Sequence, residues 1–129
     1  MTPRDLAAAL LQKARDDAHV VRTLAADPKA ADWVIGFHAQ QAVEKSLKAV
    51  LTSAGIRTGR THDLNHLLDL LTDSSIEVPE FLSEVASLGP YAVTWRYAEL
   101  EVEEPLDRQV TLDLLDRVLA WCSGLLAND

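Results

Sequence analysis

The stretch DWVIGFHAQQAVEKSLKAVL at residues 32–51 decides the fold. At about 100° per residue, its aliphatic side chains gather on one side of a helix: Val43, Leu47, Val50 and Leu51. Gly55 follows where a residue that closes a helix is expected. The sequence therefore predicts its longest helix over residues 31–54.

Two features of this segment bear on packing. Four of its residues are small enough to let a neighbouring backbone approach closely: Gly36, Ala39, Ala42 and Ala49. Gln40 projects in the same direction as the aliphatic residues, and a buried amide without partners costs about 1–3 kcal/mol. We therefore expect Gln40 either to bond to another helix or to line an internal polar pocket.

Hydrophobic periodicity predicts four further helical segments, at residues 3–26, 61–72, 79–98 and 105–126. Gly89-Pro90 should break or kink the third of these. The stretch ELEVEE at 99–104 alternates like a strand, but the chain offers no second strand, so we interpret it as an acidic loop. Short connections between amphipathic helices predict an all-α fold, an antiparallel up-and-down bundle of four to five helices forming one domain over residues 1–129.

Composition narrows the class of protein. No apolar run reaches the roughly 18 residues that span a membrane, and no apolar core of a secretion signal follows Met1. Cys122 is the single cysteine, so no disulfide can form within the chain. We expect a cytoplasmic protein that has no membrane contact.

Charge is distributed unevenly along the chain. The net charge of −8 argues against a broad nucleic-acid surface. Residues 38–62, however, carry four cationic side chains against one carboxylate, whereas residues 63–107 carry eleven carboxylates against Arg96. A local basic patch can hold a phosphate or a few nucleotides, although two ordinary solvated faces would give the same pattern.

One narrow arc of the 31–54 helix carries a polar ridge, formed by His38, Gln41, Lys45 and Lys48. An imidazole, an amide and two cations can together bind a phosphate and a base edge. An exposed helix face that keeps the protein soluble would also carry such residues, so spacing alone leaves both interpretations open.

A second candidate is the basic stretch that precedes the third helix. Thr61 is expected to cap this helix and Asp63 to lie in its first turn. Free N–H groups at the helix start, together with Arg57, Arg60 and His62, can form a phosphate cradle. The alternative is that Asp63 caps the turn and His62 is solvated.

Two motifs, FHAQQAVEKSLKAVL at 37–51 and THDLNHLL at 61–68, resemble the HEPN (higher eukaryotes and prokaryotes nucleotide-binding) domain. Arg96-Tyr97 resembles a third element of that family. The resemblance implies a helical bundle that commonly forms a homodimer. It also implies a genomic partnership with a minimal nucleotidyltransferase, the two often acting as a toxin–antitoxin pair.

The sequence departs from the nuclease members of that family in one respect. Those members are metal-independent ribonucleases in which a histidine follows an arginine after four to six residues. Beyond Arg96 the corresponding positions hold Glu101, Val102 and Glu103, and no histidine follows His66. Since an imidazole would have to move the ribose 2′-hydroxyl proton, we expect a binding role in preference to a catalytic one.

We therefore predict a nucleotide- or RNA-binding interaction module that needs neither a metal nor another cofactor. Its expected nucleotide- or phosphate-binding residues are His38, Gln41, Lys45, Lys48, Arg57, Arg60, His62, Asp63, Arg96 and Tyr97. Broad apolar surfaces on the first and last helices favour a homodimer, although a fully buried helix would show the same pattern. The alternatives are a ribonuclease that uses His38 or His62 with Arg96, and a purely structural dimeric adaptor.

Overall fold

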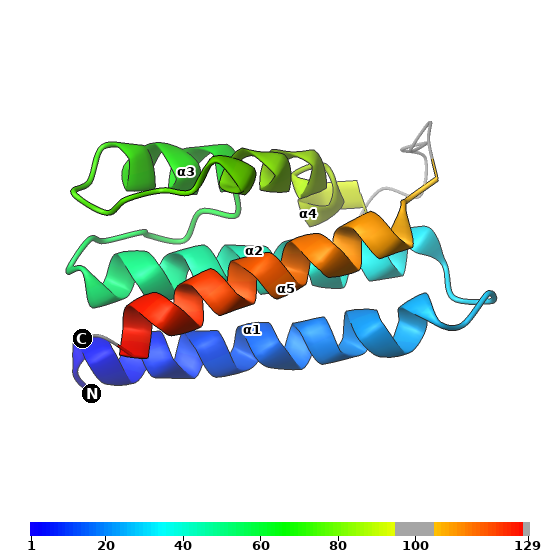
Figure 1. Ribbon diagram of the computed structural model, residues 1–129, viewed down its shortest axis with the longest axis horizontal. Helices are drawn as coiled ribbons and strands as arrows, with labels where there is room; N and C mark the ends of the chain where they lie inside the picture. The colour runs from blue at the N-terminus through cyan, green and yellow to red at the C-terminus, as the bar shows by residue number, and fades with distance from the viewer. Residues whose placement is uncertain (95–104, 128–129) are drawn as a thin grey trace.

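The computed structural model describes residues 1–94 and 105–127, and this part of the chain contains helices joined by short connections and has no strand. Its elements, in order, are α1 (Pro3–Ala25), α2 (Asp32–Ser53), α3 (Leu64–Thr72), the 3₁₀ helix η1 (Glu80–Leu88), α4 (Tyr91–Thr94) and α5 (Arg108–Ala127). The predicted all-α bundle is confirmed (Figure 1). The expected acidic loop at 99–104 lies outside the described residues.

Helix α2 lies at the centre of the bundle and contacts every other helical element. Helices α1 and α5 pack along it, whereas α3, η1 and α4 form a shorter layer on its other side (Figure 1). The chain reverses between α1 and α2, so these neighbours are antiparallel. The start of α1 and the end of α5 lie at the same end of the molecule (Figure 1).

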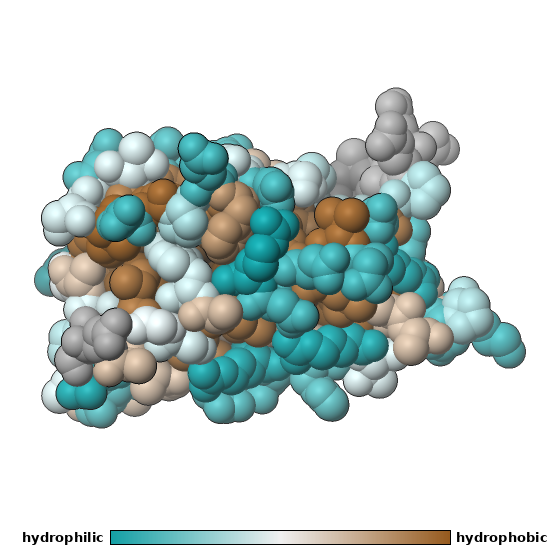
Figure 2. Space-filling view, viewed as in Figure 1, coloured by the Kyte–Doolittle hydropathy of each residue, from teal (hydrophilic) through white to brown (hydrophobic). Residues whose placement is uncertain are grey.

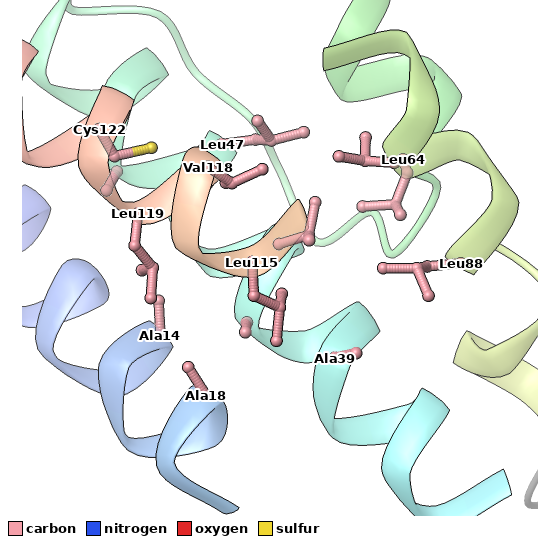
Figure 3. Packing of buried hydrophobic residues seen from close by; sticks show 14 of the residues in the cluster. Ala14, Ala18, Ala39, Leu47, Leu64, Leu88, Leu115, Val118, Leu119 and Cys122 are labelled. Atoms are coloured by element: carbon pink, nitrogen blue, oxygen red, sulfur yellow. The ribbon is translucent and has the colours of Figure 1, made fainter. Parts of the chain in front are cut away.

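The core fills the spaces around α2 with aliphatic side chains and alanines. Leu119 of α5 points toward α1, where Ala14 and Ala18 lie, whereas Val118 points toward Leu47 of α2 (Figure 3). Both alanines are fully buried, so small side chains bring these helices close together. The expected role of small residues is confirmed for α2 as well, where Ala39, Ala42 and Ala49 are buried.

Local signals set the ends of α1 and α2. Thr2 and Asp5 form a reciprocal capping box at the start of α1, each side chain accepting the other's N–H at 3.1 Å. At the end of α2, Ile56 donates to the Leu51 carbonyl at 2.9 Å and Gly55 takes a φ of 77°. This is the Schellman pattern, and it confirms the helix end predicted at Gly55.

Helix α3 begins later than predicted. Its N-cap is Asp63, whose carboxylate accepts the N–H of Asn65 at 2.9 Å. Thr61 lies two residues earlier and its hydroxyl accepts the Asp63 N–H at 3.1 Å. The expectation that Thr61 caps the helix is therefore wrong. The Thr61 hydroxyl forms a turn with the Asp63 N–H before the helix begins, and the Asp63 carboxylate caps the helix instead.

The fourth predicted segment forms a 3₁₀ helix followed by a short α-helix. Leu82, Val85 and Leu88 are buried at intervals of three residues, which matches the three residues per turn of a 3₁₀ helix. The predicted break at Gly89-Pro90 is confirmed, since η1 ends before it and α4 follows it.

Arg108, the first residue of α5, ties three parts of the chain together. Its guanidinium lies 3.1 Å from the Asp32 carboxylate at the start of α2. It also donates to the carbonyls of Asp27, at 2.8 Å, and Ala30, at 2.6 Å, in the connection between α1 and α2. The guanidinium therefore joins the start of α5 to the start of α2 and to the backbone of the connection between α1 and α2.

Candidate functional site

The polar ridge lies on the part of α2 that the bundle leaves uncovered. Its members are half-buried, in contrast to the fully buried core side of the helix: His38, Gln41, Lys45 and Lys48. The arrangement of the four on one face is thus as predicted. The structure adds two carboxylates, from Asp17 and Glu44, which divide the ridge into two clusters.

The first cluster joins α2 to α1. The two carboxylate oxygens of Asp17 bind different side chains, the imidazole Nδ1 of His38 at 3.1 Å and the ammonium of Lys45 at 2.5 Å. Asp17 is only 14% exposed, so this ion pair is well shielded from water. Lys45 is consequently neutralised by its own protein, which reduces its capacity to bind a phosphate.

The second cluster surrounds Glu44, whose side chain is only 4% exposed. The carboxylate accepts from Gln40 at 3.2 Å and Lys48 at 3.3 Å, and one of its oxygens lies 3.0 Å from Nδ1 of His62. Gln41 donates to the Gln40 amide oxygen at 2.7 Å. This buried charge therefore has both a cationic partner and neutral donors.

The second cluster also contains the hydrogen-bond partners of the buried Gln40 amide. Besides Glu44, its amide nitrogen donates to the backbone carbonyl of His62 at 3.3 Å. Among the described residues, its partners thus come from α2 itself and from the connection to α3, and the expected bond to another helix is wrong. No buried side-chain nitrogen or oxygen in the described part of the chain is left without a partner.

The connection between α2 and α3 runs back alongside α2. Ile56 is bonded near the end of α2 at Leu51, whereas His62 reaches Glu44 and Gln40 near its middle. This path presents the imidazole of His62 to solvent, where the side chain is 63% exposed. Since an ionised Glu44 carboxylate can only accept, Nδ1 carries the hydrogen, and Nε2, which has no partner among the described residues, bears the lone pair of the neutral ring.

The predicted phosphate cradle is only partly assembled. Arg57 and Arg60 are exposed, and within the described residues neither guanidinium makes a hydrogen bond or ion pair. The carboxylate of Asp63, however, occupies an N–H group at the α3 terminus that the cradle would have used. The described residues that remain available to an anion are thus Arg57, Arg60 and His62, without the helix end.

Two of the predicted site residues, Arg96 and Tyr97, lie outside the described residues. In the described part of the chain, no three histidine, cysteine or acidic side chains gather in a way that suits a metal ion. Likewise, no helix among the described residues is long and apolar enough to cross a membrane.

Sequence reasoning did not identify Asp17 and Glu44 as parts of the site. Glu44 had a usable signal, because its position four residues after Gln40 places it at the edge of the buried side of α2. The sequence contains no corresponding signal for Asp17, because the role of this residue depends on how α1 packs against α2.

Comparison with known proteins agrees with this architecture. The model of the HEPN domain matches residues 7–125. The crystal structure of TT1696 from Thermus thermophilus is similar over 92% of this chain and 97% of its own, with 26% identity and a TM-score of 0.72. ST0689, described as an archaeal HEPN homologue, covers 93% of this chain and 97% of its own, with 21% identity and a TM-score of 0.69. None of the curated proteins matches significantly.

Proposed function

Because the chain belongs to the HEPN domain family, we propose that it is a nucleotide- or RNA-binding interaction module. The observation that carries this proposal is the exposed imidazole of His62, held in place by the buried Glu44. The same loop bears two guanidiniums that have no partner among the described residues. HEPN membership supports a nucleotide- or RNA-related role for the family as a whole.

The loop has the chemistry that a short single-stranded RNA or a nucleotide requires. Arg57 and Arg60 can each bind a phosphate through two parallel N–H donors. Nε2 of His62 can accept from a ribose hydroxyl or, when protonated, donate to a phosphate. Lys45 and Lys48 act mainly by holding the two carboxylates, and therefore the imidazoles, in position.

The test is binding of a short fluorescent single-stranded RNA, followed by anisotropy. Arg60→Glu should raise Kd at least about tenfold, because one phosphate contact becomes a repulsion. His62→Ala should also weaken binding. Lys29→Glu makes the same charge change in the connection between α1 and α2 and should leave Kd nearly unchanged. Equal effects of Arg60→Glu and Lys29→Glu would contradict a defined site and leave the structural adaptor as the better interpretation.

We also propose that the protein is a cytoplasmic homodimer paired with a minimal nucleotidyltransferase in a toxin–antitoxin-like module. The homodimer is supported by hydrophobic patches that lie between the hydrophilic side chains on the face seen in Figure 2. Leu6, Trp33 and Val110 are 43%, 47% and 56% exposed. Light scattering after size-exclusion chromatography should give twice the 14.2 kDa chain mass. A monomer at micromolar concentration would contradict the dimer.

A metal-independent ribonuclease is the second candidate, because a buried carboxylate next to an imidazole also suits general base catalysis. Nε2 of His62 would take the 2′-hydroxyl proton, and the 2′-oxygen would attack phosphorus. As the bond to the 5′-oxygen breaks, that oxygen would take a proton from solvent. RNA cleavage in EDTA that is lost in His62→Ala and kept in His66→Ala would favour this candidate, and intact RNA would exclude it.

A further inference from the structure

A hollow of about 590 Å³ lies where the start of α1 meets the end of α2 and the loop that follows it. Residues from three segments line it, among them Pro3, Leu6, Thr52, Ile56, Arg57 and Thr58. Its volume is within the range of about 300–1,000 Å³ that is typical of small-molecule sites.

The lining combines apolar walls with a few polar groups. Pro3, Leu6 and Ile56 supply aliphatic surface, and Arg57 is the lining residue that has a charged side chain. Within the described part of the chain, no hydrogen bond of this guanidinium or of the Thr52 and Thr58 hydroxyls is present, so all three are available to a ligand. The matching ligand has an apolar body, some hydroxyl or amide groups and one anionic group.

The loop at this hollow has a defined backbone. Gly55 and Gly59 take φ angles of 77° and 66°, a region that other residues rarely adopt. Ile56 is bonded to the Leu51 carbonyl in the last turn of α2. The Arg57 side chain therefore starts from a fixed point, which lowers the ordering cost of binding.

We propose that this hollow binds the base and ribose of a nucleoside monophosphate, with the phosphate on Arg57. The inference rests on the proposed function and deepens it by naming a subsite for a single nucleotide. The loop continues from Arg57 to Arg60 and His62, so a strand whose terminal nucleotide occupies the hollow has its next phosphates close to the groups of the candidate site.

Isothermal titration of the full chain with a nucleoside monophosphate, the bare nucleoside and inorganic phosphate tests the subsite. The monophosphate should bind at least about tenfold more tightly than either part, because only it fills the walls and meets the guanidinium. Arg57→Glu should remove most of this affinity. Leu6→Trp, a change at a partly exposed position that fills the hollow, should also remove it, whereas Lys29→Glu should not.

Other results of these titrations would overturn the subsite. Equal affinity for inorganic phosphate and the monophosphate, or no effect of Leu6→Trp, overturns the subsite. Tighter binding of a medium-chain carboxylate also overturns it and assigns the hollow to acyl chains. If RNA binding still depends on Arg60 and His62 while the monophosphate does not bind, the subsite fails and the proposed function stands. Far-ultraviolet circular dichroism of each variant confirms that the fold is intact.

Discussion

At the scale of single residues, Glu44 shows how a buried charge can organise a surface site. Its carboxylate lies inside the bundle, yet its partners include the exposed His62 and the half-buried Lys48. A carboxylate that binds several donors restricts the orientation of each of them. The rigidity of the candidate site therefore originates from a group that no ligand has to touch.

Removal of Glu44 should be costly. In Glu44→Ala, the ammonium of Lys48 loses its partner while its side chain is only 13% exposed. Leaving one member of a buried pair without its partner typically costs about 3–5 kcal/mol, and we expect a loss near the lower end of this range. Urea unfolding measures it. Glu80→Ala removes an exposed carboxylate and should change the free energy of unfolding by less than about 0.5 kcal/mol.

Cys122 provides a test of burial at alkaline pH. Burial raises the pKa of its thiol to about 12, from an ordinary value of 9.0. The native protein should therefore react with a disulfide reagent at pH 8 far more slowly than the protein in urea. Comparable rates in the two states would show that the side chain is accessible.

The same shift makes stability depend on pH. Because the pKa of the thiol is higher in the folded state, its contribution to the free energy of unfolding is complete below the unfolded pKa of 9.0. This contribution is lost as pH rises toward about 12. Cys122→Ala abolishes this contribution. The difference in unfolding free energy between the parent and this variant should therefore narrow above pH 9, by up to about 1.4 kcal/mol per pH unit.

At the scale of elements, Gly36 sets the distance between α2 and α4. A Cβ at this position would overlap the ring of Tyr91. Gly36→Ala should therefore push α4 away and cost about 1–3 kcal/mol. Gly124→Ala is the matched control within α5, where a Cβ meets nothing, and should stabilise by up to about 1 kcal/mol. Thermal unfolding of the two variants should shift in opposite directions.

Arg108 gives a second prediction about element packing. Arg108→Ala removes one donor from the Asp32 carboxylate and from the carbonyls of Asp27 and Ala30 and should cost about 2–3 kcal/mol. Arg108→Lys should recover only part of this loss, because one ammonium cannot reach the same set of acceptors. Arg22→Ala, which removes an exposed pair with Asp116, should cost less than about 1 kcal/mol. Urea unfolding of the three variants measures these differences.

Elements with strong local signals could be predicted from sequence, and elements whose form depends on packing could not. Apolar periodicity and Gly55 located α2, because a Schellman end needs only local bonds. By contrast, the expected helical spacing around Leu82 and Val85 did not distinguish α from 3₁₀, because the two patterns share the interval of three residues. The start of α3 was misplaced because Thr61 and Asp63 are both good caps.

At the scale of the whole molecule, charge divides the chain into two halves. Residues 1–60 hold nine cationic side chains and six carboxylates, whereas residues 61–129 hold three and fourteen. An RNA should therefore approach through the first half and contact few phosphates. We expect log K to fall with log salt with a slope of about −1 to −2, since Arg57 and Arg60 account for about two single-strand contacts. A slope steeper than about −4 would contradict so small a contact area.

The candidate site was predictable to the extent that it follows one helix face. His38, Gln41, Lys45 and Lys48 share the predicted arc because helix geometry fixes their angles. Their pairing with Asp17 and with Glu44 depends on tertiary packing, which helix spacing does not contain. For this reason the sequence predicted four free polar groups, and the structure has two organised clusters instead.

The return path of the connection between α2 and α3 has a consequence for diversity and engineering. This connection is anchored twice, at Leu51 through Ile56 and beside Gln40 through His62, so only residues 57–61 span between the anchor points. Because neither anchor lies inside that span, we expect changes of length and sequence there to have little effect on α2 and α3. Grafting alternative segments there offers a direct way to retune ligand preference while leaving the scaffold untouched.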